Sequence, residues 1–294
     1  MKTATTYLLA CVSLVSACVL GLLLFERHTY AQVARPTNNV RLSVVAEPRP
    51  LARAADLLQR KLGVGISYED PPWIYQGDLV EAANLPSNLE IKKTSPRFHA
   101  TVPAVGSLDL SLPLNVASHS ISMPAISVLQ DLLSEHVRRG NPGEFKVLTL
   151  GGDFSIVPFV ARDKVGNSLA VRSPLDFAVS FPNAARDGNA ALKTLCEAIT
   201  EASGMRTSAN GVPKLFFTTT VSLNATNEPA RDVLVRLLRT LTWPDPRQNV
   251  VPIPKLSWRL LYDPEAQAYF LNIGLVLKET LGATGQTMLV TVPR

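Results

Sequence analysis

Cysteine is scarce in this sequence, with three residues among 294. Cys11 and Cys18 lie in an apolar N-terminal segment, so the rest of the chain holds Cys196 alone and cannot form an internal disulfide. The fold must therefore be stabilised by its hydrophobic core. Cys196 falls at helical spacing from Leu192 and Ile199, which predicts a buried structural thiol and not a nucleophile.

The sequence also lacks local signatures of catalysis and ligand binding. It has no Gly-x-Ser-x-Gly elbow, no Gly-x-Gly-x-x-Gly run and no phosphate-binding loop. Its four histidines, at positions 28, 99, 119 and 136, show no His-x-x-x-His or Glu-x-x-His spacing. His136 falls on the apolar side of a predicted helix, where a core-edge role is expected. We predict no catalytic residue, no metal site and no cofactor from local sequence, which leaves open a site assembled by the fold.

Charged residues are few, at 18%, and hydrophobic residues reach 46%, which favours a packed core over disorder. The length suits about two domains. The net charge of +5 is spread along the chain, and the densest groups are Lys92-Lys93 and Arg138-Arg139. Without an arginine-rich arm or basic–aromatic motif, this pattern predicts a solvated basic surface and no nucleic-acid partner.

Residues 1–31 carry the clearest local signal. Lys2 precedes an uncharged run from Thr3 to Phe25, and the small residues Thr29 and Ala31 suit cleavage by signal peptidase after Ala31. Two alternatives are an uncleaved anchor, since the apolar run approaches the roughly 20 residues that span a bilayer, and a lipid on Cys18 in the run Val-Ser-Ala-Cys. Each interpretation places the rest of the chain outside the cytoplasm, in the periplasm or an equivalent compartment, with membrane contact only through this segment.

Two segments of similar sequence predict two equivalent helices. The run MPAISVLQDLL at 123–133 matches EPARDVLVRLL at 228–238 at its proline, alanine, valine and three leucines. Proline suits the first turn of a helix, and Ser122 and Asn227 are capping residue types. The apolar residues of each segment recur at spacings of three and four, as on one helix face. Arg231 falls on the opposite, solvent-facing side of its helix.

Two pairs of oppositely charged residues are predicted to form surface ion pairs, because they have the i,i+4 spacing of helix neighbours: Asp56–Arg60 and Asp232–Arg236.

Strand patterns surround these helices in the same order twice. Leucines at 108, 110, 112 and 114 alternate with other residues, as in a half-buried strand. Earlier helices are predicted over 51–62 and 192–199, ending at Gly63 and Gly204. The remaining predicted strands are Arg41–Ala46, Gly65–Tyr68, Phe145–Leu150, Phe154–Ala161, Leu175–Phe181, Lys214–Leu223, Leu256–Tyr262 and Ala268–Val276.

These patterns predict an α+β fold of two similar halves, residues 38–162 and 173–276, each with two helices packed on a small mixed sheet. The polar residues 163–172 are the expected joint, and 277–294 form a C-terminal extension. The repeated order, with its Pro-Ala-x-x-x-Leu-x-x-Leu-Leu-type helices followed by hairpins, resembles the short N-terminal domain shared by secretins and TonB-dependent receptors. That resemblance implies a stand-alone, duplicated periplasmic docking module that contacts partner proteins through a strand edge or helix face.

One aromatic segment is a candidate binding site. Glu69-Asp70-Pro71-Pro72 precedes Trp73 and Tyr75, and the prolines favour an extended backbone that presents both rings at little entropic cost. The alternative is that Trp73 folds back over the core, as large aromatics usually do. Glu69 and Asp70 are adjacent and loop-like, so their side chains need not converge.

Two functions follow as expectations. The first is an exported binding or assembly module that contacts another envelope protein. The second is an envelope enzyme whose site lies in a cleft between the two halves, with His99 or His119 beside a carboxylate.

Overall fold

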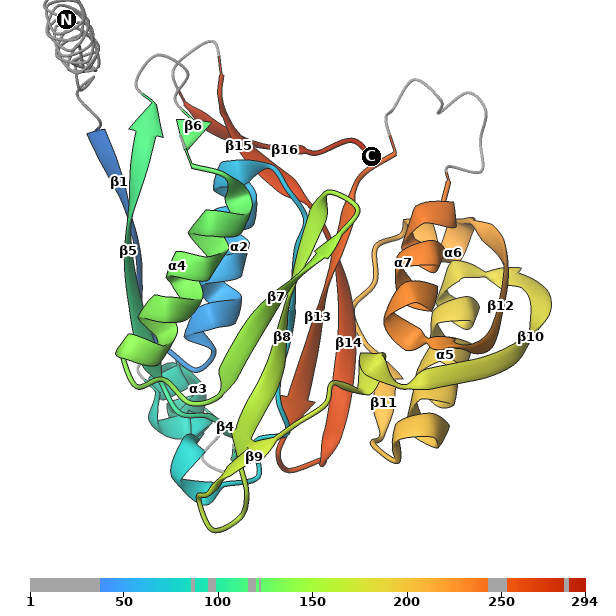
Figure 1. Ribbon diagram of the computed structural model, residues 1–294, viewed down its shortest axis with the longest axis horizontal. Coiled ribbons are helices and arrows are strands. Elements are labelled where there is room, and N and C mark those ends of the chain that lie inside the picture. Colours follow the sequence, from blue (N-terminus) through green and yellow to red (C-terminus); the bar gives the residue numbers. More distant parts are fainter. Residues whose placement is uncertain are drawn as a thin grey trace, which may run out of the picture. The chain divides into compact units, whose positions relative to one another are not determined.

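A mixed β-sheet lies at the centre of the computed structural model, which describes residues 38–85, 88–94, 99–115, 120–121, 123–242, 253–282 and 286–294 (Figure 1). Within these residues the central sheet has seven strands in the order β11-β14-β13-β2-β8-β7, with β9 paired to β8. The fold is therefore mixed α+β, as predicted. The strand bounds are β2 Ile66–Glu69, β7 Glu144–Leu150, β8 Asp153–Arg162, β9 Ser168–Ala170, β11 Thr207–Ala209, β13 Leu256–Asp263 and β14 Ala268–Leu275.

Two helices, α2 (Pro50–Leu62) and α4 (Ala125–Arg138), lie between the central sheet and a smaller sheet (Figure 1). In the smaller sheet β1 (Asn38–Glu47) pairs with β5 (Gly106–Asn115), and β5 pairs with β6 (Ser120–Ile121). The helices therefore have one sheet on each side, and their apolar faces form the core between the two sheets.

Helix α2 begins at a proline and ends before a glycine, and both residues set its bounds for local reasons. Proline at position 50 occupies its first turn, where the missing N–H costs nothing. The helix ends at Gly63, whose φ of 67° lies in the left-handed region that glycine adopts without a steric penalty. The Gly63 N–H donates to the carbonyl of Gln59 at 2.8 Å. Leu58, in the middle of the apolar face, is fully buried.

A second layer of helices follows further along the chain. Helices α5 (Gly188–Ser203) and α7 (Ala230–Thr240) pack on the antiparallel pair β10 (Ala178–Asp187) and β12 (Thr220–Pro229). Gly204 ends α5 in the left-handed conformation, as the sequence predicted. Cys196 lies buried in this layer, and burial raises the pKa of its thiol to about 12, so the expectation of a structural thiol is confirmed.

Three local predictions in this layer are wrong. The strand expected over Leu175–Phe181 begins as a 3-10 turn at Pro174–Asp176, and β10 starts only at Ala178. The run Lys214–Leu223 was expected to be one strand, but it begins as the short helix α6 (Leu215–Thr218), and β12 starts only at Thr220. Leu215 and Phe216 are both buried, and adjacent residues of a strand cannot bury their side chains on one face. Asn227 does not cap α7: it lies within β12 at a φ of 48°, and Pro229 holds the cap position. Ser122, the other expected cap, lies outside the described residues.

Strand pairing joins segments that were expected to form separate sheets. β2 pairs parallel with β8, which pairs antiparallel with β7. β11 pairs parallel with β14, which pairs antiparallel with β13. β13 then pairs parallel with β2 through Arg259–Tyr68 and Leu260–Glu69. The expectation of one small sheet per half is therefore corrected, because strands from 38–162 and from 173–276 share the central sheet.

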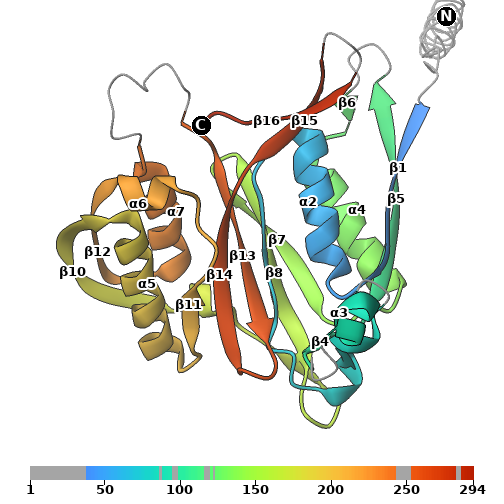
Figure 2. The ribbon, with the colours of Figure 1, turned by 180° about the vertical axis from the view of Figure 1, so that it is seen from behind.

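The remaining elements lie at the periphery. β3 (Leu79–Glu81) pairs with β4 (Thr101–Pro103), near helix α3 (Leu89–Thr94) and the short 3-10 helices Gln76–Asp78 and Ala82–Asn84; another such turn covers Pro174–Asp176. Residues 277–294 contain the hairpin of β15 (Leu277–Leu281) and β16 (Thr287–Thr291), and β15 runs beside α2 (Figure 2). From Asn39 to Arg294 the chain forms one compact unit.

Candidate functional site

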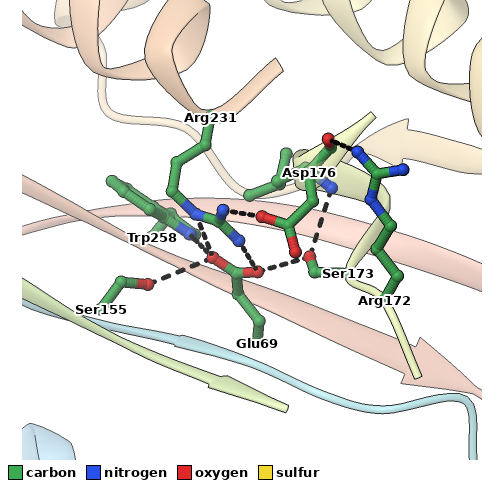
Figure 3. A network of polar contacts seen from close by, with 8 residues as sticks. Glu69, Ser155, Arg172, Ser173, Asp176, Arg231 and Trp258 are labelled. Atoms are coloured by element: carbon green, nitrogen blue, oxygen red, sulfur yellow. Dashed lines mark hydrogen bonds and ion pairs between the residues drawn. The ribbon is translucent and has the colours of Figure 1, made fainter. Parts of the chain in front are cut away.

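A buried carboxylate lies at the centre of the most extensive polar cluster in the described chain (Figure 3). Glu69 is the last residue of β2 and is fully buried. Its Oε1 accepts hydrogen bonds from the hydroxyl of Ser155 at 3.1 Å and from the indole N–H of Trp258 at 3.2 Å. Its Oε2 accepts one from the hydroxyl of Ser173. The neighbouring strands β8 and β13 therefore supply donors to a charge on the strand between them.

Arg231 neutralises this carboxylate from the first turn of α7 (Figure 3). Its Nη2 lies 2.7 Å from Glu69 Oε2, and its Nη1 forms an ion pair with Asp176. Burial by itself would lower the pKa of the Arg231 guanidinium, but the carboxylates of Glu69 and Asp176 outweigh it and raise that pKa. Arg231 is 5% exposed, so the expectation that it faces solvent is wrong. The first turn of α7 faces the central sheet, a tertiary contact that helical periodicity does not reveal.

Asp70 forms a second buried cluster, separate from that of Glu69. It is fully buried and accepts hydrogen bonds from Arg49 Nε at 2.6 Å, from the Tyr68 hydroxyl at 2.8 Å and from the backbone N–H of Tyr262 at 3.0 Å. Burial, and then Asp70, raise the pKa of Tyr68. Neighbouring side chains on an extended chain point to opposite sides, which explains why Glu69 and Asp70 do not converge.

Both carboxylates connect distant parts of the fold. Each is fully buried and accepts at least three hydrogen bonds from side-chain or backbone donors. A buried carboxylate with an arginine and several donors is stable only while its partners stay in place. The sequence singled out Glu69 and Asp70 as an acidic pair, but it gave no sign of their arginine partners, which lie 162 and 21 positions away.

The predicted surface ion pairs also have other partners. Asp56 forms its ion pair with Arg259 of β13 and not with Arg60. Arg236 binds Glu228 at 2.6 Å. In each case a charged group on a strand takes one member of the predicted pair: the donor Arg259 of β13 binds Asp56, and the acceptor Glu228 of β12 binds Arg236.

Trp73 and Tyr75 do not form a joint aromatic surface. Trp73 is 4% exposed, so it is not presented to solvent; the alternative, in which it folds over the core, describes its position. Gly143 has a φ of 80°, which favours glycine, and a Cβ there would approach the Trp73 ring closely, at 3.3 Å. Tyr75 is half-buried, with the guanidinium carbon of Arg162 5.7 Å from its ring centroid.

The histidines do not assemble a reactive centre in the described chain. His136 is buried, as expected for a core-edge residue, and its Nε2 lies 3.1 Å from the carbonyl oxygens of Pro142 and Gly143. His99 is exposed, with Nδ1 3.7 Å from a carboxylate oxygen of Glu81. His28 and His119 lie outside the described residues. Among those that are described, no cluster of histidine, cysteine and acidic side chains could hold a metal ion.

Within the part of the chain that the structure describes, the hairpin β15–β16 has a run of exposed apolar side chains. All five residues of β16 are exposed, including the consecutive Met288, Leu289 and Val290, which are 50%, 49% and 40% exposed. Leu281 at the end of β15 is 62% exposed. In the described part of the chain β16 pairs with β15 only, so its outer edge has unpaired backbone groups. An apolar strand edge of this kind favours pairing with another chain.

Comparison with known proteins gives no relative: no protein-family model, no curated protein and no solved structure matches the chain. Across the residues that the structure describes, no helix is both long and apolar enough to cross a membrane. The N-terminal segment 1–31, with Cys11 and Cys18, lies outside those residues.

Proposed function

We propose that this protein is an exported binding or assembly module that contacts another envelope protein. The observation that carries the proposal is the apolar outer edge of β16. Soluble proteins usually protect strand edges with charges, prolines or covering elements, but β16 presents Met288, Leu289 and Val290 to solvent. An extended apolar segment of a partner can add to such an edge, gaining main-chain hydrogen bonds and side-chain contacts together.

The proposal includes an internal duplication. Apart from the 3-10 turns and the short elements β3, α3, β4, β6 and α6, the order in 38–162 is β1–α2–β2, then β5–α4–β7–β8. In 173–276 it is β10–α5–β11, then β12–α7–β13–β14. The matching strands pair in the same way: β2 is parallel to β8 as β11 is to β14, and β7 and β13 each complete a hairpin. Leu129 and Leu234 hold matching helix positions and are both fully buried. This correspondence supports two related halves of the short N-terminal domain type found in secretins and TonB-dependent receptors.

The buried ion pair gives the module a fixed frame. Glu69 belongs to the first half and Arg231 to the second, and their pairing connects the two through the interior. A rigid frame reduces the entropy that is lost when a surface binds a partner. Because β15 packs on α2, the apolar hairpin would be held in one orientation when a partner binds it.

Site-specific photo-crosslinking in envelope-containing cells tests this function. A photoreactive residue in place of Leu289 should give one discrete crosslinked partner. An excess of the unmodified chain should compete for that partner and reduce the crosslink, whereas an excess of the Leu289→Lys chain should not. The matched control is Phe217, an apolar residue that is 58% exposed and belongs to α6, a helix that lies apart from β15 and β16 in both ribbon views (Figures 1 and 2). Crosslinks of equal yield from positions 289 and 217, or no discrete product from 289, would contradict docking at β16.

A further inference from the structure

A pocket among the described residues lies between α2 and the strands β13, β14 and β15. Its volume is about 160 Å³ and it is partly open to solvent. That volume resembles the roughly 150 Å³ cavity that accepts a benzene molecule in a well-studied protein interior. The lining residues are Asp56, Gln59, Arg60, Ser257, Arg259, Gly274, Leu275 and Leu277.

The floor of the pocket is open because one strand residue has no side chain. Ser257 of β13 pairs with Gly274 of β14. A Cβ built on Gly274 would meet no atom within 4 Å, and its backbone is outside the left-handed region, so local geometry does not require glycine there. Leu275 and Leu277 supply apolar surface at the side. The glycine therefore creates space that any larger residue would fill.

The polar groups of the pocket are mostly donors. Arg259 uses its Nη1 on the carbonyls of Ile66 and Trp258 and its Nη2 on Asp56, but its buried Nε–H has no acceptor among the described residues. Arg60 forms no ion pair with any described side chain. Asp56, the carboxylate of the pocket, is already held by Arg259. The pocket lining therefore has two guanidinium groups and one carboxylate, which gives it a net positive charge.

We propose that this pocket binds a small organic carboxylate with a short apolar body. The Arg60 guanidinium and the free Nε–H of Arg259 supply charge-assisted donors for the carboxylate, and the Ser257 hydroxyl adds a neutral donor. Leu275, Leu277 and the open space above Gly274 receive the apolar body. This site is distinct from the β16 edge, so either can exist without the other.

The test is a titration of the full chain with benzoate, followed by amide chemical shifts in NMR spectra, with neutral benzamide as the isosteric comparison. Benzoate should cause saturable shifts at Ser257, Arg259 and Gly274, and benzamide should not. Gly274→Leu should abolish these shifts by filling the floor. Arg60→Gln should weaken binding roughly fivefold, as expected for one partly exposed ion pair.

The control for charge is Arg53→Gln, which removes an exposed arginine from the same helix without altering the pocket lining. It should leave benzoate binding unchanged. Saturable shifts that survive Gly274→Leu in a folded protein would overturn the site. Equal binding of benzamide, equal weakening by Arg53→Gln, or no saturable shift in the unmodified protein would each overturn the proposed recognition of a carboxylate. Thermal unfolding of each variant shows that it is folded.

Discussion

Replacing Arg231 by alanine should destabilise the fold far more than a surface arginine substitution does. The change removes the cation that neutralises Glu69, whose side chain is fully buried, and it also leaves Asp176 without its partner. Removing one partner of a buried ion pair costs about 3–5 kcal/mol, mainly because the other charge stays behind in a poor environment. Ser155, Ser173 and Trp258 still donate to Glu69, which places the expected loss near the lower end, at about 3 kcal/mol.

Urea denaturation followed by circular dichroism measures this loss as a change in the free energy of unfolding. Arg53→Ala is the matched control, since Arg53 is an exposed residue inside α2 and its removal should cost less than about 0.5 kcal/mol. Adding Glu69→Gln to Arg231→Ala should recover part of the stability, because it removes the stranded charge. If Arg231→Ala costs no more than Arg53→Ala, or if Glu69→Gln adds its full independent cost, the buried ion pair does not hold the structure together.

Two further predictions follow from the core. Leu129→Ala and Leu234→Ala should each lower the free energy of unfolding by about 2–5 kcal/mol, measured by urea denaturation, since both side chains are fully buried; a loss below 1 kcal/mol at either position would contradict its packing. Burial lowers the pKa of His136 below 6.5, although its contacts with Pro142 and Gly143 oppose the shift. The unfolded chain then binds a proton that the folded chain does not, so stability should fall as pH drops from about 6.5 through the folded pKa. His136→Gln should flatten that decline in urea denaturation repeated across this pH range, and an unchanged decline in the variant would contradict the assignment to His136.

Several local features followed from the sequence, although the strand expected over Lys214–Leu223 and the cap expected at Asn227 did not. The helix ends at Gly63 and Gly204 depend on the conformational freedom of a single residue, and both were predicted. The strands β7 and β8 were also predicted, and the turn between them contains Gly151 and Gly152, whose φ values are 61° and 98°. Apolar periodicity likewise identified the buried faces around Leu129 and Leu234. In each case the determining interactions span only a few positions along the chain.

The tertiary structure alone decided which charges are buried and which strands meet. Arg231 has the spacing of a solvent-facing helix residue, but α7 turns its first residues toward the sheet, where Glu69 lies 162 positions away. Asp56 and Arg60 have ideal spacing for a pair, but Arg259 of β13 takes the carboxylate. Trp73 could be read as exposed or folded inward until its packing beside Gly143 was known. The sequence by itself therefore determined the helices, the hairpins and their cores, because those depend on short-range periodicity and turn chemistry. Partners for buried charges, the shared central sheet and the pocket over Gly274 depend on how distant segments pack, which a local pattern does not encode.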